Sequence, residues 1–170
     1  MELVILTDQD GNEIGSAEKI SAHQHGGQLH LAFSTFVFNE KNELLLQKRA
    51  STKYHFANLW SNTCCGHPRP GEEVIVAAQR RLSEEFGFST KLRQQSTLLY
   101  EAYDERTELS EKEFLHILIG HYNKAPSPNP AEISDWRLAT LDNINTEIAT
   151  IPQNYTPWFR MLIGRLLTSI

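Results

Sequence analysis

The chain has 170 residues, of which 40% are hydrophobic and 22% charged, and its formal net charge is −5. This length is enough for one well-buried core, so we expect a single domain over residues 1–170. The negative charge argues against nucleic acid as a partner, because proteins that bind nucleic acid carry a basic patch or stripe. No apolar run is long enough to cross a bilayer, and the first residues lack the basic region of a signal peptide. We therefore expect a cytoplasmic protein with no membrane partner.

The only two cysteines of the sequence, Cys64 and Cys65, are adjacent. Neighbouring Cα atoms lie about 3.8 Å apart, which is shorter than the usual range for a disulfide. We therefore expect two free thiols, which suits a reducing compartment.

The first half of the chain is predicted to hold a strand, a turn, a hairpin and a helix. The strand, the turn and the two hairpin strands are expected at Leu3–Leu6, Asp10-Gly11-Asn12, Leu29–Asn39 and Leu44–Arg49. The helix is expected over Glu72–Phe86, because apolar residues recur there at every fourth position. Gly87 follows at the place where a helix stops.

The second half adds three strands, an exposed loop and a last helix. The strands are expected at Leu98–Tyr103, Phe114–Tyr122 and Ile133–Leu138, and the loop at Ala125–Pro130. Thr156 is predicted to cap a helix that begins at Pro157 and continues through Met161, Leu162, Leu166 and Ile170. This order of elements predicts an α/β (α+β) fold in which a mixed sheet is packed between helices.

The most informative stretch of the sequence is Trp60–Pro68, which contains Cys65-Gly66-His67 and is followed by Arg80–Gly87. The second segment resembles the Nudix box, in which arginine, glutamate, an apolar residue, any residue and two glutamates precede a glycine. Here Arg81 stands where Nudix hydrolases have the glutamate that follows the arginine. The exchange removes a Mg²⁺-binding carboxylate and adds a cation, so it favours binding of a diphosphate over its hydrolysis.

Together with the Cys-Gly-His run, this box resembles the type 1 isopentenyl-diphosphate delta-isomerases of the Nudix superfamily. The resemblance extends over nearly the whole chain in segments that keep their order. These are Ala17-Glu18-Lys19, His23, Leu29–Ser34, Arg49-Ala50-Ser51 with Lys53, Tyr103, Glu111-Lys112-Glu113 and Pro157-Trp158. The resemblance implies a Nudix fold with an N-terminal extension that carries metal ligands, in a monomer or weak homodimer.

The activity implied by the resemblance is the movement of a carbon–carbon double bond. A proton adds to the terminal methylene of isopentenyl diphosphate and another leaves C2, giving dimethylallyl diphosphate through a tertiary cation. Cys65 and Glu113 are implied as the acid–base pair, with Tyr103 donating a hydrogen bond to the carboxylate. Trp158 would hold its electron-rich face against the cation and help to exclude water, although it could equally be a core residue of the last helix. Cys64 is expected to be a small buried hydrophobe.

The resemblance also implies a metal centre, whose ligands are His23, His30, His67, Glu111 and Glu113. Imidazole nitrogens and carboxylate oxygens suit Mn²⁺ or Zn²⁺ better than Mg²⁺ alone. In an extended segment Glu111 and Glu113 face the same side, and two like charges held together need a cation or a proton between them. The alternative is a set of scattered surface histidines beside an acidic loop. The other histidines, His25, His55, His116 and His121, are expected to be structural or on the surface.

The substrate would be held by its diphosphate. Glu85 is implied as the ligand of a Mg²⁺ ion that bridges the diphosphate oxygens, and Arg81 as a planar donor to them. Lys19, Arg49 and Lys53 would complete the group of cations. The alternative for Arg81 and Glu85, which are four residues apart on one helix, is a surface ion pair worth a few tenths of a kcal/mol.

Two other classes of function stay open beside the isomerase. A Mg²⁺-dependent Nudix diphosphohydrolase would use the same fold to direct water at phosphorus, and Arg81, Cys65 and the histidines speak against it. A binding module without catalysis is the second alternative. The presence of both Cys65 and Glu113 argues against that module, because a binder has no need of an acid and a base.

Overall fold

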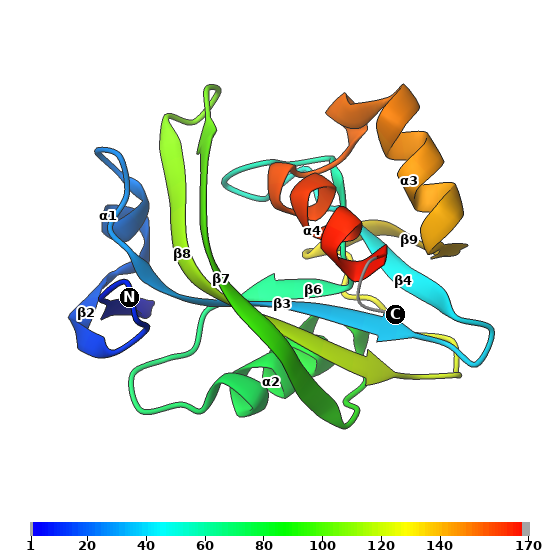
Figure 1. The fold of residues 1–170 in the computed structure, drawn as a ribbon, viewed down its shortest axis with the longest axis horizontal. Helices are drawn as coiled ribbons and strands as arrows, with labels where there is room; N and C mark the ends of the chain where they lie inside the picture. The colour runs from blue at the N-terminus through cyan, green and yellow to red at the C-terminus, as the bar shows by residue number, and fades with distance from the viewer. Residues whose placement is uncertain (1, 168–170) are drawn as a thin grey trace.

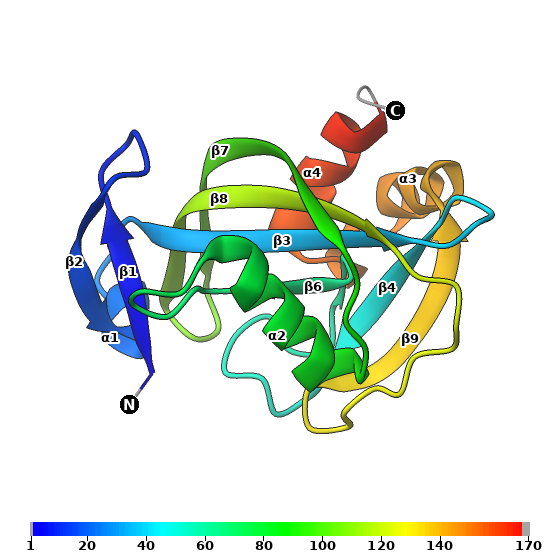
Figure 2. The same cartoon turned by 90° about the horizontal axis from the view of Figure 1, so that it is seen from below.

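The structure is a computed structural model that describes residues 2–167. Over these residues, nine strands form one mixed sheet with helices on both faces (Figures 1 and 2). The elements are β1 (Leu3–Thr7), β2 (Glu13–Glu18), α1 (Lys19–His23), β3 (His30–Phe38), β4 (Glu43–Arg49), β5 (Trp60–Ser61), β6 (Cys64–Gly66), α2 (Val74–Phe86), β7 (Leu92–Asp104), β8 (Leu109–His121), β9 (Ile133–Thr140), α3 (Leu141–Thr150), the 3₁₀ turn η1 (Pro152–Asn154) and α4 (Pro157–Leu167).

Strand β3 is the centre of the sheet. It pairs with β8 in parallel and with β1 and β6 in antiparallel orientation, while β2 extends the sheet beyond β1 and β7 beyond β8. The predicted hairpin of β3 and β4 is confirmed, but the two strands pair only at Phe38 and Leu44. Beyond that point β4 pairs with β5 and β9 instead.

Each face of the sheet has its own hydrophobic core, so the predicted mixed sheet between helices is confirmed. Helix α2 packs Ala78, Leu82 and Phe86 against one face. On the other face Phe159 of α4 and Ile144 of α3 lie in a second cluster. Full burial of such side chains contributes roughly 1.5–3 kcal/mol each, so the two clusters fix the sheet between its helices.

Most of the predicted elements agree with the structure to within two residues. Helix α2 ends at Phe86, and Gly87 follows with φ 71°, the left-handed conformation that glycine adopts without strain. Helix α4 begins at Pro157 as predicted, whereas Ile170 lies outside the described residues. The segment Ala125–Pro130 is a loop. No helix of residues 2–167 is long and apolar enough to span a membrane.

The main difference concerns β7 and β8, which are both longer than predicted. The polar run Arg93–Thr97 concealed the first half of β7, whose pairing with β8 does not depend on an apolar pattern. Strand β8 begins before Glu111 and Glu113, so these two residues are extended and face the same side, which is the arrangement expected for an extended segment. The short elements β2, α1, β5 and β6 and the helix α3 were not predicted.

Candidate active site and metal centre

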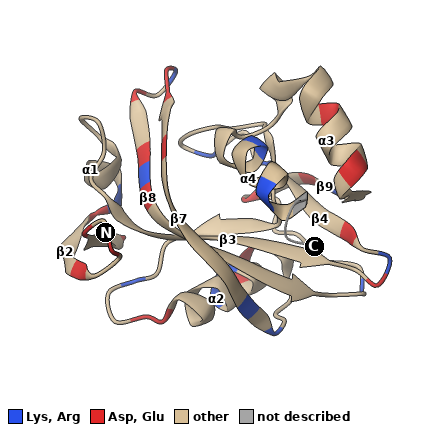
Figure 3. Cartoon of the chain, in the orientation of Figure 1, with Lys and Arg blue, Asp and Glu red and all other residues tan. Residues whose placement is uncertain are grey.

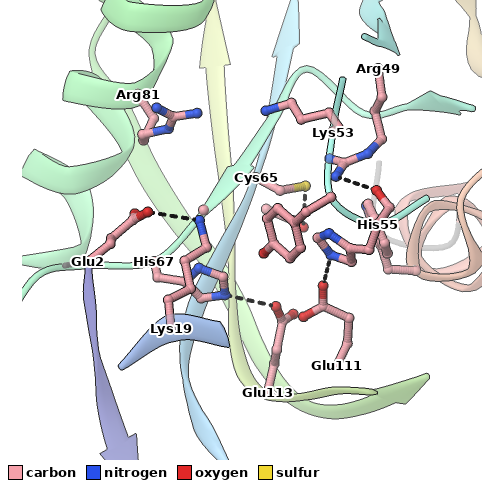
Figure 4. A pocket seen from close by; sticks show the side chains of 14 residues that line it. Glu2, Lys19, Arg49, Lys53, His55, Cys65, His67, Arg81, Glu111 and Glu113 are labelled. Carbon is pink, nitrogen blue, oxygen red and sulfur yellow. Dashed lines mark hydrogen bonds and ion pairs between the residues drawn. The ribbon is translucent and has the colours of Figure 1, made fainter. Parts of the chain in front are cut away.

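A cleft with about 590 Å³ of open space lies beside β3, β6 and β8 (Figure 4). Most of the predicted site residues line the cleft: Lys19, Arg49, Lys53, Cys65, His67, Arg81, Glu111, Glu113 and Trp158. The fold thus brings segments from both ends of the chain to one place.

Four side chains converge at one end of this cleft. They are His23 at the end of α1, His30 at the start of β3, His67 just after β6, and Glu111 on β8. One potential ligand atom from each lies within 4.8 Å of all the others, and all four residues are buried or nearly so. The histidines predicted as metal ligands therefore form a cluster in the interior rather than a scattered surface set.

The backbone fixes which nitrogen of two imidazoles faces the cluster. Nδ1 of His23 lies 2.6 Å from the carbonyl oxygen of Lys19, and Nδ1 of His30 lies 2.7 Å from that of Gln28. A carbonyl oxygen can only accept, so Nδ1 carries the proton and donates it in both residues. In the neutral form of each ring Nε2 is then unprotonated and free to bind a metal ion, and hydrogen bonds of this kind orient metal-binding histidines.

The distances within the cluster fit a divalent cation. Nε2 of His23 lies 3.1 Å from Oε2 of Glu111, and Nε2 of His30 lies 3.1 Å from Nε2 of His67. A cation about 2.0–2.2 Å from each ligand separates neighbouring ligand atoms by about 2.8–3.1 Å in octahedral and about 3.3–3.6 Å in tetrahedral geometry. Lone pairs at such distances repel unless a proton or a cation lies between them. The residues present therefore fit an ion that prefers nitrogen and oxygen ligands.

Glu113 joins the cluster to the rest of the cleft. It lies beside His30 in the parallel register of β3 and β8, and its Oε1 is 3.4 Å from Nε2 of His67. Burial, together with the nearby charge of Glu111, raises the pKa of Glu113 well above its ordinary value. A carboxyl group that is protonated so readily is suited to exchanging a proton with a bound molecule.

Cys65 faces the cleft from β6. Its Sγ donates to Oδ1 of Asn62 at 3.2 Å and lies 3.2 Å from Oγ of Ser34 on the neighbouring strand. Burial raises the pKa of the Cys65 thiol to about 11, so the group is a neutral thiol near neutral pH. Cys64 is fully buried in the core beneath α2, and both cysteines are free, as the sequence predicts.

Trp158, on α4, is both a wall of the cleft and a member of the core, and it is only 5% exposed. Its Nε1–H lies 3.0 Å from Oγ of Ser61 and 3.1 Å from Oδ1 of Asn62. The guanidinium carbon of Arg49 lies 5.4 Å from the centre of the Trp158 ring, within the range of a cation–π contact. Asn62 thus holds both Cys65 and Trp158.

The cations that line the cleft come from different elements and have acidic or carbonyl partners. Lys19 lies 3.1 Å from Glu2, Lys53 contacts Glu132, and Arg49 donates to backbone carbonyls. Figure 3 shows basic residues interspersed with acidic ones over the elements in this view. An anionic ligand would therefore be attracted by this local group of cations and not by an overall positive field.

Arg81 and Glu85 form a buried pair on α2. Nη1 of Arg81 lies 2.6 Å from Glu84, and Nη2 lies 2.5 Å from Oε1 of Glu85. Glu85 is only 2% exposed and also accepts a hydrogen bond from Gln47 at 2.9 Å. Glu85 is not among the residues that line the cleft, whereas its partner Arg81 is.

The structure corrects the assignment of Tyr103. In the β7–β8 ladder Tyr103 lies opposite Ser110, on the other face from Glu111 and Glu113, and it is 55% exposed. The residue opposite Glu113 is Tyr100, three positions earlier. Tyr103 therefore cannot donate to this carboxylate.

Tyr100 has the properties that were expected of Tyr103. It is 6% exposed, and its hydroxyl has no hydrogen-bond partner among the described residues. Burial and the charge of Glu113 raise its pKa. Only the register of the ladder distinguishes the two tyrosines, and the sequence does not reveal that register.

Sequence reasoning also missed three residues at the cleft. His55 was expected to be structural or on the surface, but it lines the cleft and contacts Glu111. Tyr54 stacks on His55 with 4.1 Å between the ring centres. Ser34 lies beside the thiol of Cys65. No local pattern in the sequence marks these residues.

Comparison with known proteins identifies the family. The model of the NUDIX domain matches residues 28–159. The isopentenyl-diphosphate delta-isomerase of Halorhodospira halophila is 54% identical over 96% of this chain and 94% of its own length. That of Serratia proteamaculans is 46% identical over 97% of this chain and 91% of its own length. The chain belongs to the isopentenyl-diphosphate delta-isomerase family.

The solved structures show how this delta-isomerase family member relates to other Nudix proteins. A Deinococcus radiodurans crystal structure superposes with a TM-score of 0.79 at 18% identity, covering 96% of this chain and 98% of that one. A MutT protein from Methanosarcina mazei gives a TM-score of 0.67 at 19% identity, covering 81% and 91%. At these identities the likeness shows the Nudix fold alone. The delta-isomerase relatives therefore identify the family, while the solved structures confirm the fold.

Proposed function

We propose that the chain interconverts isopentenyl diphosphate and dimethylallyl diphosphate, the reaction after which its relatives are named. The observation that carries the proposal is that the Cys65 thiol and the Glu113 carboxyl group line one cleft together with four cationic side chains. A hydrolase that directs water at phosphorus has no use for a buried neutral thiol. A binding module has no need of an acid–base pair.

The reaction requires one proton to be delivered and another to be removed. The double-bond electrons form a new C–H bond at the terminal methylene and leave a tertiary cation at C3. The C–H bond at C2 then breaks, and its electron pair forms the new double bond. Cys65 and Glu113 are the pair that exchanges these protons, since both line the cleft and both are groups that can give up and take back a proton.

Tyr100 takes the supporting role that the sequence assigned to Tyr103. Its position opposite Glu113 on the neighbouring strand and its unpartnered hydroxyl support a hydrogen bond to the Glu113 carboxyl group. Such a bond would hold the carboxyl group in one orientation and stabilise its ionised form after it loses a proton.

The diphosphate group binds the substrate to the protein and does not react. Lys19, Arg49, Lys53 and Arg81 would bind its oxygens, with the Arg81 guanidinium as a planar donor. Glu85, beside Arg81, is the proposed ligand of a Mg²⁺ ion, which when bound would neutralise part of the diphosphate charge.

The buried cluster would hold the second metal ion. His23, His30, His67, Glu111 and Glu113 offer the nitrogen and oxygen ligands that suit Mn²⁺ or Zn²⁺, and such an ion would neutralise the two adjacent carboxylates. Lys19 and His23 precede the segment that matches the NUDIX domain model. We propose that these residues belong to an extension that completes the site.

The cation formed during the reaction must be stabilised and kept from water. Trp158 lines the cleft with its aromatic ring, whose electron-rich face attracts a positive charge. Trp158 is buried and Cys65 and Glu113 are partly buried, which supports a site from which bulk water is excluded once the substrate fills it.

Nuclear magnetic resonance distinguishes the isomerase from the hydrolase directly. The purified protein is mixed with isopentenyl diphosphate, Mg²⁺ and Mn²⁺, and proton and phosphorus spectra are taken from the same tube. New allylic methyl signals with an intact diphosphate are expected. Release of phosphate without those signals would replace the proposal with a Nudix diphosphohydrolase.

A further inference from the structure

The segment 50–59, between β4 and β5, forms part of the cleft wall and contains a strained backbone. Tyr54 and His55 line the cleft. The next residue, Phe56, has φ 47°, and Asn58 has φ 63°. A left-handed conformation is tolerated by asparagine but is uncommon for a bulky aromatic residue. Such strain persists only where the surrounding contacts hold it, and it is concentrated at functional sites.

Contacts from two sides hold this segment in place. Nε of Arg49 donates to the carbonyl oxygen of Phe56 at 3.2 Å, and Nη2 donates to that of His55 at 3.1 Å. The backbone N–H of Phe56 donates to Oδ2 of the buried Asp104 at 3.0 Å. The backbone is therefore fixed on both sides of the His55 side chain.

The result is that His55 reaches a carboxylate of the metal cluster. Nε2 of His55 contacts Oε1 of Glu111, while Oε2 of the same carboxylate lies 3.1 Å from Nε2 of His23. His55 is 5% exposed, and its Nδ1 has no hydrogen-bond partner among the described residues. Each oxygen of Glu111 thus has its own imidazole, one from the metal cluster and one from the strained segment.

We propose that His55 is a positioning residue that orients Glu111 for metal binding. Its Nε2–H donates to one oxygen of the carboxylate and leaves the other oxygen directed at the cluster of His23, His30 and His67. Without this bond the carboxylate could rotate about its last side-chain torsion, which is broad in energy. The inference rests on the proposed metal centre and adds a residue that is not itself a ligand.

The rigidity of the segment is what makes the bond effective. A histidine on a mobile loop would lose conformational freedom each time it oriented Glu111. Here Arg49 and Asp104 have already fixed the backbone at Phe56, so little further ordering is needed. The strain at Phe56 is then a consequence of directing the preceding side chain into the cleft.

Titration of the metal-free protein with Mn²⁺ tests the proposal, with free Mn²⁺ followed by electron paramagnetic resonance. Replacing His55 by phenylalanine keeps an aromatic ring but removes the donor, and it is expected to raise the dissociation constant about 10–100-fold. In His55→Gln the side-chain amide can donate in place of Nε2–H, so the constant is expected to stay within about threefold of the original protein. His116→Phe is the matched control, because His116 lies on the same strand as Glu111 but contacts Gln94 instead.

A second variant tests the segment without changing the imidazole. Asp104→Ala removes the acceptor for the Phe56 N–H and is expected to weaken Mn²⁺ binding in the same direction. Circular dichroism of each metal-free variant establishes that it is folded.

Three results would overturn parts of this account in distinguishable ways. Unchanged Mn²⁺ affinity in folded His55→Phe would refute the positioning role while leaving the metal centre intact. Affinity lost equally in folded His55→Gln and His55→Phe would refute the donated hydrogen bond as the cause, because the glutamine variant restores a donor and would fail to rescue binding. Absence of tight Mn²⁺ binding by the original protein would refute the proposed metal centre itself.

Discussion

Replacing Asn62 by alanine should weaken both the fold and the site, because this one side chain connects several groups around the cleft. Asn62 is fully buried. Its Nδ2 donates to the carbonyl oxygens of Thr35 and Cys64 at 3.1 Å each, and its Oδ1 accepts from Cys65 and Trp158. One amide oxygen thus hydrogen-bonds to both the thiol of Cys65 and the indole of Trp158.

The size of the effect follows from which partners keep a second contact. Trp158 keeps its hydrogen bond to Ser61, and Cys65 keeps its contact with Ser34. The loss of the hydrogen bonds that these two residues make to Asn62 is therefore partly compensated. The two carbonyl oxygens lose their side-chain donor, and each unsatisfied buried group costs about 1–3 kcal/mol. We therefore expect Asn62→Ala to lower the free energy of unfolding by about 2–6 kcal/mol.

Thermal unfolding followed by circular dichroism measures this effect. For a domain of this size about 1 kcal/mol corresponds to about 2–4 °C, so the midpoint should fall by about 4–24 °C. Asn123→Ala is the control, because Asn123 is an exposed asparagine that accepts one hydrogen bond from Glu40. A midpoint lowered no further in Asn62→Ala than in the control would refute the connecting role of Asn62.

Three further predictions concern charge and metal. Arg81→Glu restores the acidic residue of Nudix hydrolases and removes a charged hydrogen bond to the diphosphate, so it should raise the Michaelis constant about 10–100-fold. An unchanged constant would contradict the role of Arg81 in binding the diphosphate. Arg80 donates to Glu72 at 2.7 and 2.8 Å, and these hydrogen bonds lower the pKa of the Glu72 carboxyl group to about 2. The ionised carboxylate therefore stabilises the fold fully above its unfolded pKa of about 4.3, and this stabilisation is lost as the pH falls towards 2. Because Glu72 is partly exposed, Glu72→Gln should lower the free energy of unfolding by only about 1 kcal/mol at pH 7. In urea unfolding, the difference in this free energy between the variant and the original protein should shrink between pH 4.5 and 2, and a difference that grows would contradict the prediction. Removal of metal by a chelator should lower the midpoint of thermal unfolding. Mn²⁺ at a hundred times its dissociation constant should restore about 2.7 kcal/mol of the free energy of unfolding. An unchanged midpoint would count against a structural effect of the metal.

Local periodicity was sufficient to predict α2, β3 and β4, but not α1 and β6, which also carry residues of the site. The apolar residues of α2 recur at helical spacing, β3 is rich in aromatic and β-branched residues, and β4 contains three consecutive leucines. The period of two along a strand also predicted that Glu111 and Glu113 share a face. Family motifs then predicted residues that the fold brings together although they are distant in sequence.

The residues that were missed depend on contacts that no local pattern contains. Tyr100 and Tyr103 differ only in which face of β7 they occupy, and the pairing register with β8 decides this. His55 reaches Glu111 because long-range hydrogen bonds, including that to Asp104, hold a strained loop. Such features are determined by tertiary packing, and only the structure reveals them.

The central claim is that Cys65 and Glu113 exchange the two protons, and solvent deuterium tests it most directly. The original protein, Cys65→Ala and Glu113→Gln are incubated with isopentenyl diphosphate in deuterated water, and deuterium in the allylic methyl group is measured by nuclear magnetic resonance. The account predicts incorporation by the original protein and none by either variant, although both remain folded. Most of the activity surviving in Cys65→Ala would contradict the two-sided proton transfer.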